Sequence, residues 1–172
     1  RAWSNYGNNE NNFSQIGNQQ SRPEAAPVEK IINSVDSVLM AHCLKNGIDP
    51  TSSSAPCTMK AAVAQFLSIP NGRIADLPSG IRRKVAENIR LIATGAKSKP
   101  NYIIADNGEG QTALTLPSTI LSLGESNKLR IPFVQGKFNM GGSGVLQFCG
   151  IAGLQLVVTR RDLAIADPAD PT

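Results

Sequence analysis

The stretch YIIADNGEGQT, residues 102–112, joins a short apolar run to an acid and two glycines. The run is too short for a helix and rich in residues that favour strands, so residues 101–106 are predicted to form a strand ending on Asp106. Gly108 and Gly110 then remove side chains from the backbone next to the carboxylate. A flat ligand could approach such a backbone while Asp106 accepts a hydrogen bond from it. Glycine-rich turns are weak signals alone, so this interpretation depends on the rest of the chain.

Composition limits the classes of protein. The 172 residues are 41% hydrophobic and 17% charged, which suits one globular domain. No apolar run approaches the roughly 18 residues of a membrane span and no secretory segment is recognised, so no membrane association is expected. The three cysteines show no metal-type pairing and their odd number argues against a disulfide framework, so a cytoplasmic location is expected. The net charge of +4 permits contact with phosphates without requiring a nucleic acid.

The chain divides into an arm and a domain. Residues 1–22 are rich in Asn and Gln and are expected to form a flexible arm, with docking through Trp3, Tyr6 and Phe13 as an equal alternative. Residues 23–172 are expected to form the folded domain. Because the first residue is Arg1 rather than Met, the chain is expected to be a fragment of a larger protein.

Hydrophobic spacing predicts three helices before the strand. The first covers residues 24–47 and ends at Gly47, with an apolar stripe of Val28, Ile31, Ile32, Val35, Leu39 and Cys43. The second is short, within residues 57–67. The third covers residues 79–95, with a stripe of Ile81, Val85, Ile89 and Ile92. The cations beside that stripe favour a solvated basic face over a nucleic-acid patch; they are Arg82, Arg83, Lys84 and Arg90.

The remainder of the chain is read as a lid, a glycine loop and a strand. Residues 111–135 show no sustained period and are expected to form a long functional lid. The segment GGSGVLQFCGIAG, residues 141–153, is predicted to be a glycine loop leading into a helix, and residues 154–162 a buried strand. This order of elements predicts an α+β layered domain.

Two clusters could carry chemistry. Glu29, Asn33 and Asp36 are spaced four and three apart, so they lie on one side of the first helix. A solvated face explains them, but three oxygen-bearing side chains in line could also face a Mg²⁺ ion. The second cluster is the glycine loop, in which exposed N–H groups at a helix start would form an anion site.

The order of these motifs resembles the GHKL ATPase superfamily, whose ATP-binding domain has the Bergerat fold. The motifs that carry the resemblance are E-x-x-x-N-x-x-D on a helix, D-x-G-x-G after a strand, a lid and the glycine loop GKFNMGGSG. The resemblance covers residues 28–160. Gyrase B, MutL, the ninety-kilodalton heat-shock chaperones, the MORC proteins and the histidine kinases belong to this superfamily. The resemblance implies a two-layer α/β sandwich with a mixed sheet covered by helices.

The resemblance also implies roles for individual residues. Asp106 would accept the adenine amino group, Gly108 and Gly110 would make room for base and ribose, and Asp36 would support the adenine or water network. Asn33 would bind Mg²⁺ and Glu29 would activate the attacking water. The phosphates would lie in the glycine loop, with Lys137 as a charge partner. Its residues are Gly136, Lys137, Phe138, Asn139, Met140, Gly141, Gly142, Ser143 and Gly144.

The implied function is Mg²⁺-dependent ATP hydrolysis, in which lid closure drives homodimerisation or a conformational change in a larger machine. Histidine kinases generally lack the acid at position 29, so Glu29 favours an ATPase. The sequence departs from the superfamily pattern at Asn139 and Ser37, where the family has glycine and alanine. The adenine-side threonine and the C-terminal transducer or effector domain are also expected to be absent. The alternatives are a nucleotide-gated interaction module that binds ATP without efficient hydrolysis, and a nucleic-acid-associated component like MutL, MORC or gyrase.

Overall fold

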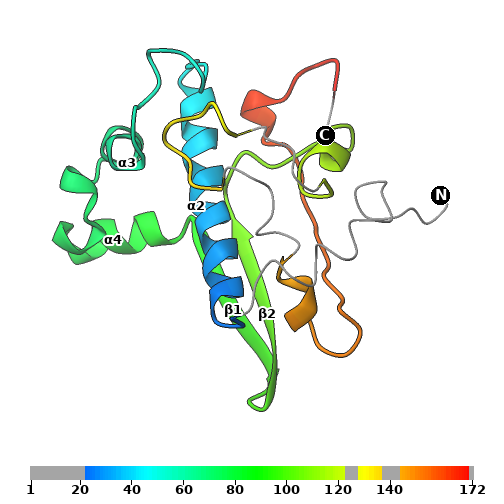
Figure 1. Ribbon diagram of the computed structural model, residues 1–172. Coiled ribbons are helices and arrows are strands. Elements are labelled where there is room, and N and C mark those ends of the chain that lie inside the picture. Colours follow the sequence, from blue (N-terminus) through cyan, green and yellow to red (C-terminus); the bar gives the residue numbers. More distant parts are fainter. Residues whose placement is uncertain (1–21, 123–127, 137–143, 171–172) are drawn as a thin grey trace. The chain divides into compact units, whose positions relative to one another are not determined.

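The computed structural model describes residues 22–122, 128–136 and 144–170 (Figure 1). These residues form two compact units, whose placement relative to each other is not defined. Unit 2 comprises Ile31–Glu109 and Ile131–Gln135, and unit 1 comprises the described parts of Arg1–Lys30, Gly110–Arg130 and Gly136–Thr172. The expected arm lies outside the described residues, apart from its last residue, Arg22.

The two helices that build the core of unit 2 were both predicted. Helix α2 (Ala25–Lys45) begins beside Pro27 in its first turn, where a missing N–H costs nothing, and Gly47 follows it with φ of 69°. Helix α3 (Met59–Leu67) starts at Thr58, whose hydroxyl accepts a 3.1 Å hydrogen bond from the Ala61 N–H. Local periodicity and capping residues are therefore sufficient to define these two helices.

The hydrophobic core of unit 2 lies between α2, α3 and the short segment Ile131–Gln135. Its fully buried members include Leu39, Cys43 and Phe133, and the Phe133 ring meets Phe66 of α3 edge-on at 6.3 Å. The expected lid ended at residue 135, but residues 131–135 belong to this core: Ile131, Phe133 and Val134 are all buried. Apolar side chains that are buried in this way hold the segment in place.

The predicted third helix is wrong in its second half. Helix α4 (Ser79–Ala86) ends where Asn88 donates hydrogen bonds from its backbone and side chain to the Val85 carbonyl. Strand β1 (Ile89–Ala96) follows and pairs antiparallel with β2 (Lys99–Asp106), which contains the predicted strand 101–106. Ile89 and Ile92 fit a helical period by their spacing, but the ladder to β2 satisfies the backbone of this β-branched run instead.

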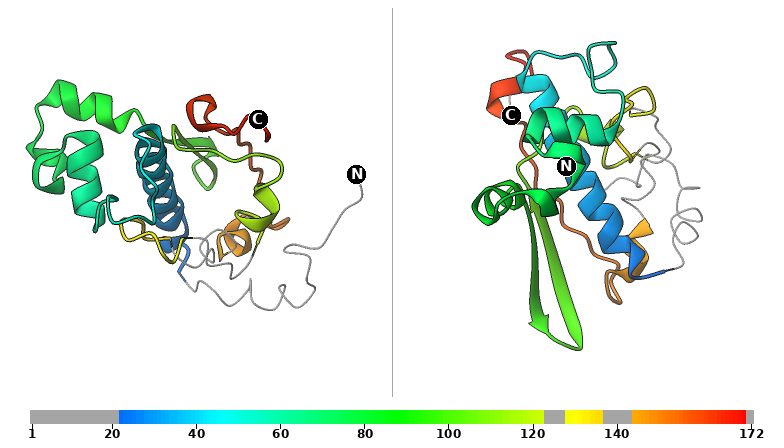
Figure 2. Two further views of the ribbon diagram at one scale, coloured as in Figure 1. Left: turned by 90° about the horizontal axis from the view of Figure 1, so that it is seen from above. Right: turned by 90° about the vertical axis from the view of Figure 1, so that its left-hand side faces the viewer.

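The β1–β2 sheet is the only one in the described residues, so the coarse α+β class is confirmed. Figure 2 shows it as a long two-stranded ribbon whose tip points away from α3 and α4. In unit 1 the predicted strand 154–162 is not formed, because residues 154–160 pair with no other strand. The helix predicted after the glycine loop is reduced to the 3-10 turn Leu146–Phe148.

Candidate functional site

Helix α2 carries the row of polar residues singled out in the sequence. Glu29 and Asn33 are half-buried, whereas Asp36 is completely buried. The Asn33 side chain makes no hydrogen bond to any residue that the structure describes, so its oxygen is available to a ligand. The row therefore changes character along the helix, from accessible oxygens near its start to a buried carboxylate in the middle.

Asp36 fixes the last segment of the expected lid, residues 131–135. Its two carboxylate oxygens both accept the Gln135 N–H, at 3.0 and 3.1 Å. In Figure 1 this segment is the yellow loop beside α2. A charged acceptor strengthens a hydrogen bond to the backbone, and the bond joins residues 99 positions apart. Asp36 acts in this structure as an internal anchor, and any influence on a ligand would pass through the groups it positions.

The turn after β2 is fixed against α2 one residue beyond Asp36. The Glu109 N–H donates to the Ser37 carbonyl at 3.1 Å, and the Asn107 N–H donates to the Asn88 carbonyl at 2.9 Å. Within the turn, Asp106 Oδ1 accepts the Gly108 N–H at 3.0 Å. Asp106 is exposed, and no described residue engages its second carboxylate oxygen. The structure thus presents one free carboxylate oxygen on a turn held by three backbone N–H groups.

Gly108 is required by packing inside the protein, and its expected role in making room for a ligand stays a prediction. A Cβ at this position would overlap the Cβ and hydroxyl of Ser37. Residue 37 was noted in the sequence as a serine where the superfamily has alanine, and the structure shows that this side chain fills the space beside the glycine. The close approach of the turn to α2 therefore depends on a missing side chain.

Gly110 makes a similar contact within unit 1. Its φ is 60°, and a Cβ there would overlap the Arg160 carbonyl. The Gly110 carbonyl accepts a hydrogen bond from Arg161 Nη1 at 3.2 Å, and the Gln111 N–H donates to the Thr159 hydroxyl at 3.1 Å. No sequence signal pointed to residues 159–161, because they lie about 50 positions away along the chain. A side chain at position 110 would therefore collide with the backbone of Arg160.

Threonine side chains hold the first part of the expected lid in a turn by hydrogen bonds. The Thr112 hydroxyl donates to Asp170 Oδ2 at 2.6 Å and also lies 3.1 Å from the Thr115 hydroxyl. Thr119 donates to the side-chain oxygen of Gln111 and to the Thr115 carbonyl. Residues 112–119 are therefore a hydrogen-bonded turn around the 3-10 helix Leu116–Ser118 rather than an unstructured loop.

Most of the expected phosphate loop lies outside the described residues. The residues concerned are Lys137, Phe138, Asn139, Met140, Gly141, Gly142 and Ser143. Of its ends, Gly136 is half-buried, and Gly144 is buried with its carbonyl accepting a hydrogen bond from Gln147 Nε2 at 3.3 Å. The anion site therefore remains a prediction from the sequence.

Lys30 is a charged residue that sequence reasoning missed. Burial lowers the pKa of its ammonium below the ordinary lysine value, while the nearby Cys149 and Glu29 oppose that change. A partly desolvated cation beside Glu29 would attract negative charge near the start of α2. Helical periodicity gave no sign of this, because Lys30 lies off both the apolar stripe and the acidic row.

His42 has a structural environment. Its ring stacks on Phe66 with centroids 6.5 Å apart and an interplanar angle of 13°. Burial lowers its pKa, and the neighbouring Lys45 lowers it further. These contacts belong to the core of unit 2, and they agree with the structural role expected from its position on the helix flank.

No group of three or more His, Cys, Asp or Glu side chains in residues 22–122, 128–136 and 144–170 could hold a metal ion. Within the same ranges, no helix is long and apolar enough to cross a membrane. No protein-family model, curated protein or solved structure matches the chain. The function must therefore be argued from the site itself.

Proposed function

We propose that this chain is an ATP-binding and Mg²⁺-dependent ATP-hydrolysing domain of the GHKL type. The observation that supports it most is the turn Asp106–Glu109, which is hydrogen-bonded to α2 beside the buried Asp36. In unit 2 this places the strand-end turn beside Asp36 and Ser37 of α2, although 70 positions separate Asp36 from Asp106. Two motifs that were recognised separately in the sequence are thereby neighbours.

Asp106 is proposed to recognise adenine. One of its carboxylate oxygens is used to hold the turn and the other is free of protein partners in the described part of the chain. A carboxylate oxygen is a strong acceptor for an amino group, and the backbone bond fixes its direction. The purine would then contact a turn whose shape is already set before the ligand arrives.

Asn33 and Glu29 are proposed to act on the triphosphate end. They are one turn apart on α2 and half-buried, so both face partly toward solvent. The Asn33 amide oxygen suits Mg²⁺, a hard cation that takes a few protein oxygens and completes its shell with phosphates and water. When bound, Mg²⁺ would neutralise phosphate charge. Glu29 would accept a proton from the attacking water as a general base.

The proposal extends to the fold and to the assembly. The β1–β2 sheet would be part of a larger mixed sheet covered by helices, in the two-layer sandwich of the superfamily. ATP binding would close the segment that begins at Gln111, promote homodimerisation and act on a C-terminal transducer or effector domain. Since Ile131, Phe133 and Val134 are buried in unit 2, the moving part is proposed to end before Ile131.

Calorimetric titration of ATP in the presence of Mg²⁺ tests the proposal through Asp106→Asn. Asparagine still offers an oxygen to the Gly108 N–H, so the turn should persist while the charge is lost. Losing a charge-assisted bond should weaken ATP binding by about tenfold to a hundredfold, or roughly 1.5–3 kcal/mol. Equal affinities for wild type and variant would remove Asp106 from the adenine site, and absence of binding by the wild type would overturn the proposal.

A further inference from the structure

The positive charge of this chain is concentrated in one segment. Residues 71–103 contain seven Lys and Arg but only Asp76 and Glu87 as acids. The remaining ten cations of the chain are slightly outnumbered by eleven acids. The net charge of +4 therefore comes entirely from α4, the β1–β2 ribbon and the residues that lead into them, all of which belong to unit 2.

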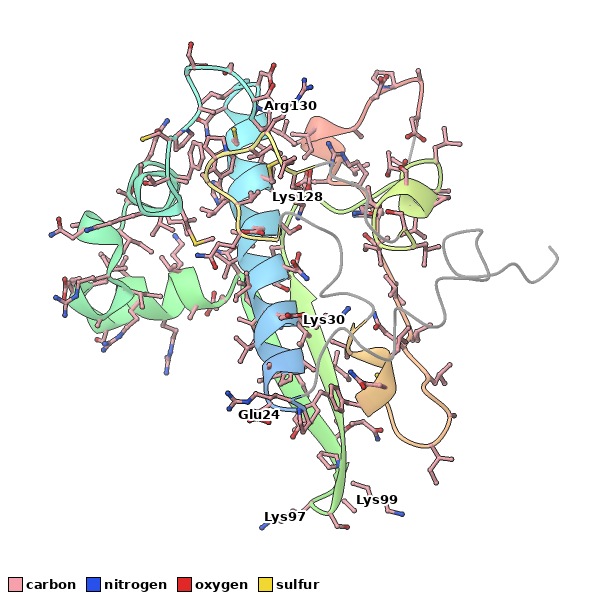
Figure 3. All side chains as sticks on the ribbon, viewed as in Figure 1. Glu24, Lys30, Lys97, Lys99, Lys128 and Arg130 are labelled. Carbon is pink, nitrogen blue, oxygen red and sulfur yellow. The ribbon has the colours of Figure 1, made fainter. Side chains whose placement is uncertain are left out.

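Six of these seven cations are exposed and have no protein partner among the described residues. They are Arg82, Arg83, Lys84, Arg90, Lys97 and Lys99. The seventh, Arg73, makes an exposed 3.5 Å ion pair with Asp76. Figure 3 shows Lys97 and Lys99 at the far end of the ribbon, where the two-residue connection Lys97–Ser98 joins the strands. A unit with six such cations attracts a polyanion more strongly than it attracts a single small anion.

The register places the two strand cations, Arg90 and Lys99, on one face of the ribbon. Side chains alternate along a strand, so Arg90, Ile92, Thr94 and Ala96 share a face with Lys99, Asn101, Ile103 and Ala105. That face carries a cation near each end and the polar cross-strand pair Thr94 and Asn101 between them. The opposite face carries Leu91, Ala93, Tyr102 and Ile104 and no cation. The two faces of the ribbon are therefore chemically different.

We propose that the β1–β2 ribbon and α4 form a binding surface for double-stranded DNA. A two-stranded ribbon fits the major groove of B-form DNA, which is about 12 Å wide. The ribbon is eight residues long, or about 26 Å at the rise of a strand, so it can lie along the groove with its cations against phosphates. Asn101 and Thr94 present donors and acceptors to base edges, while the α4 cations contact the backbone nearby. Asp106, the last residue of β2, pairs with Ile89 on the opposite face, so the cationic face does not include the residues assigned to ATP.

The tip of the ribbon distinguishes this partner from an anionic membrane. A hairpin that inserts into lipid carries apolar side chains at its tip, whereas this tip is Ala96, Lys97, Ser98 and Lys99. Apart from Ala96 and Pro100, the apolar residues of the two strands lie at least four positions from the Lys97–Ser98 connection. Duplex RNA fits less well, since the major groove of the A-form helix is too narrow and deep for side chains to read.

Fluorescence anisotropy with a labelled 20-base-pair DNA duplex, measured at several salt concentrations, tests the surface. The variant is Lys97→Ala with Lys99→Ala, and its matched control is Lys45→Ala with Lys60→Ala, which removes two exposed lysines of unit 2 outside the segment. Each phosphate contact contributes about 0.9 to the slope of log affinity against log salt. The first variant should lower that slope by about 2 and the affinity by about tenfold or more at 0.1 M salt. The control should stay within about twofold.

The competing partners are measured with the same proteins. An RNA duplex of the same sequence should bind more weakly than the DNA, and vesicles containing phosphatidylserine should not compete for the protein. The proposal is overturned if the wild type does not bind the DNA, if both double variants lose affinity equally, or if RNA or vesicles bind more tightly. The DNA-binding assay contains no nucleotide, so its result does not depend on whether the protein binds ATP.

Discussion

The two halves of α2 differ in burial and in the use of their polar groups. In the C-terminal half Val38, Leu39, Met40, Ala41 and Cys43 are all buried. In the N-terminal half Val28 is 53% exposed, and Glu29 and Asn33 are half-buried. The sequence predicted a single apolar stripe along the whole helix. The structure shows instead that one half packs in the core of unit 2, whereas Glu29 and Asn33 in the other half are only half-buried.

We therefore expect one helix to serve both the stability of unit 2 and the binding of a ligand. Asp36 and Ser37 lie at the transition, where the helix holds both the core segment ending at Gln135 and the turn at Gly108. Substitutions on the C-terminal side should change the free energy of unfolding, and those on the N-terminal side should change what the protein does. The following substitutions test this division in order of their expected effect on stability.

The largest loss of stability should come from Leu39→Ala. Leu39 is fully buried against the core of unit 2, so truncation removes buried surface and leaves a cavity. The expected cost is about 2–5 kcal/mol in the free energy of unfolding, measured by chemical denaturation. Val28→Ala on the exposed half is the control and should cost less than about 0.5 kcal/mol. Similar losses for the two variants would contradict the division.

Asp36→Ala should come next. It removes both oxygens that accept the Gln135 N–H and leaves that donor unsatisfied beside the core. Losing a hydrogen bond to a charged group should cost about 1.5–3 kcal/mol. Asp36→Asn keeps one acceptor oxygen and should cost less. If both variants unfold at the same denaturant concentration as wild type, the anchoring role of Asp36 is wrong.

Gly108→Ala tests the contact between the turn and α2. The new Cβ would overlap Ser37, and overpacking of this kind costs about 1–3 kcal/mol. Ser37→Gly removes two of the three atoms that the new Cβ would overlap, the third being Asp106 Oδ1, at a cost of about 1 kcal/mol for glycine in a helix. The double variant should therefore be more stable than the sum of the two single changes predicts, which thermal unfolding can measure. Strict additivity would argue that the two residues do not touch.

Glu29→Ala and Asn33→Ala should have the smallest effect on stability and the largest on activity. Both residues lie in the half-exposed part of α2, so unfolding should change by less than about 0.5 kcal/mol. Asn33→Ala should lose Mg²⁺-dependent nucleotide binding. Glu29→Ala should bind ATP but turn it over about 10²–10⁴ times more slowly, the usual worth of a general base.

Single-turnover ATP hydrolysis and calorimetric binding, both measured on the longest natural form of the protein, separate the two roles. Unchanged turnover in Glu29→Ala would contradict the general-base assignment. If the wild type binds ATP and does not hydrolyse it, the nucleotide-gated interaction module becomes the better account.

Local signals were sufficient for part of the fold. Helix α3 has its N-cap at Thr58, α2 has Gly47 beyond its end, and strand 101–106 is a short β-branched run, so each could be predicted from neighbouring residues. Strand β1 was missed because Ile89 and Ile92 are three apart, a spacing that helices and paired strands both tolerate. A strand depends on its partner, and the sequence of one strand does not identify that partner.

The contacts of the candidate site were not predictable, because they are long-range backbone contacts. Asp36 was selected as an acid on a helix face, yet its partner is an N–H 99 positions away. Gly108 and Gly110 were recognised as special positions, but the neighbours that require them are Ser37 and Arg160. Residue type indicated where chemistry could occur, and only the folded backbone showed which groups were already engaged.

The most direct test of the account is a titration of isotopically labelled protein with ATP and Mg²⁺, followed by two-dimensional amide NMR. The account predicts saturable shifts of the Asn33, Asn107 and Gly108 amides, with the Leu39 and Cys43 amides unmoved. Asp106→Asn should need about tenfold or more ATP to reach the same shifts. Shifts that leave the Asn107 and Gly108 amides unchanged would contradict a nucleotide site at this turn.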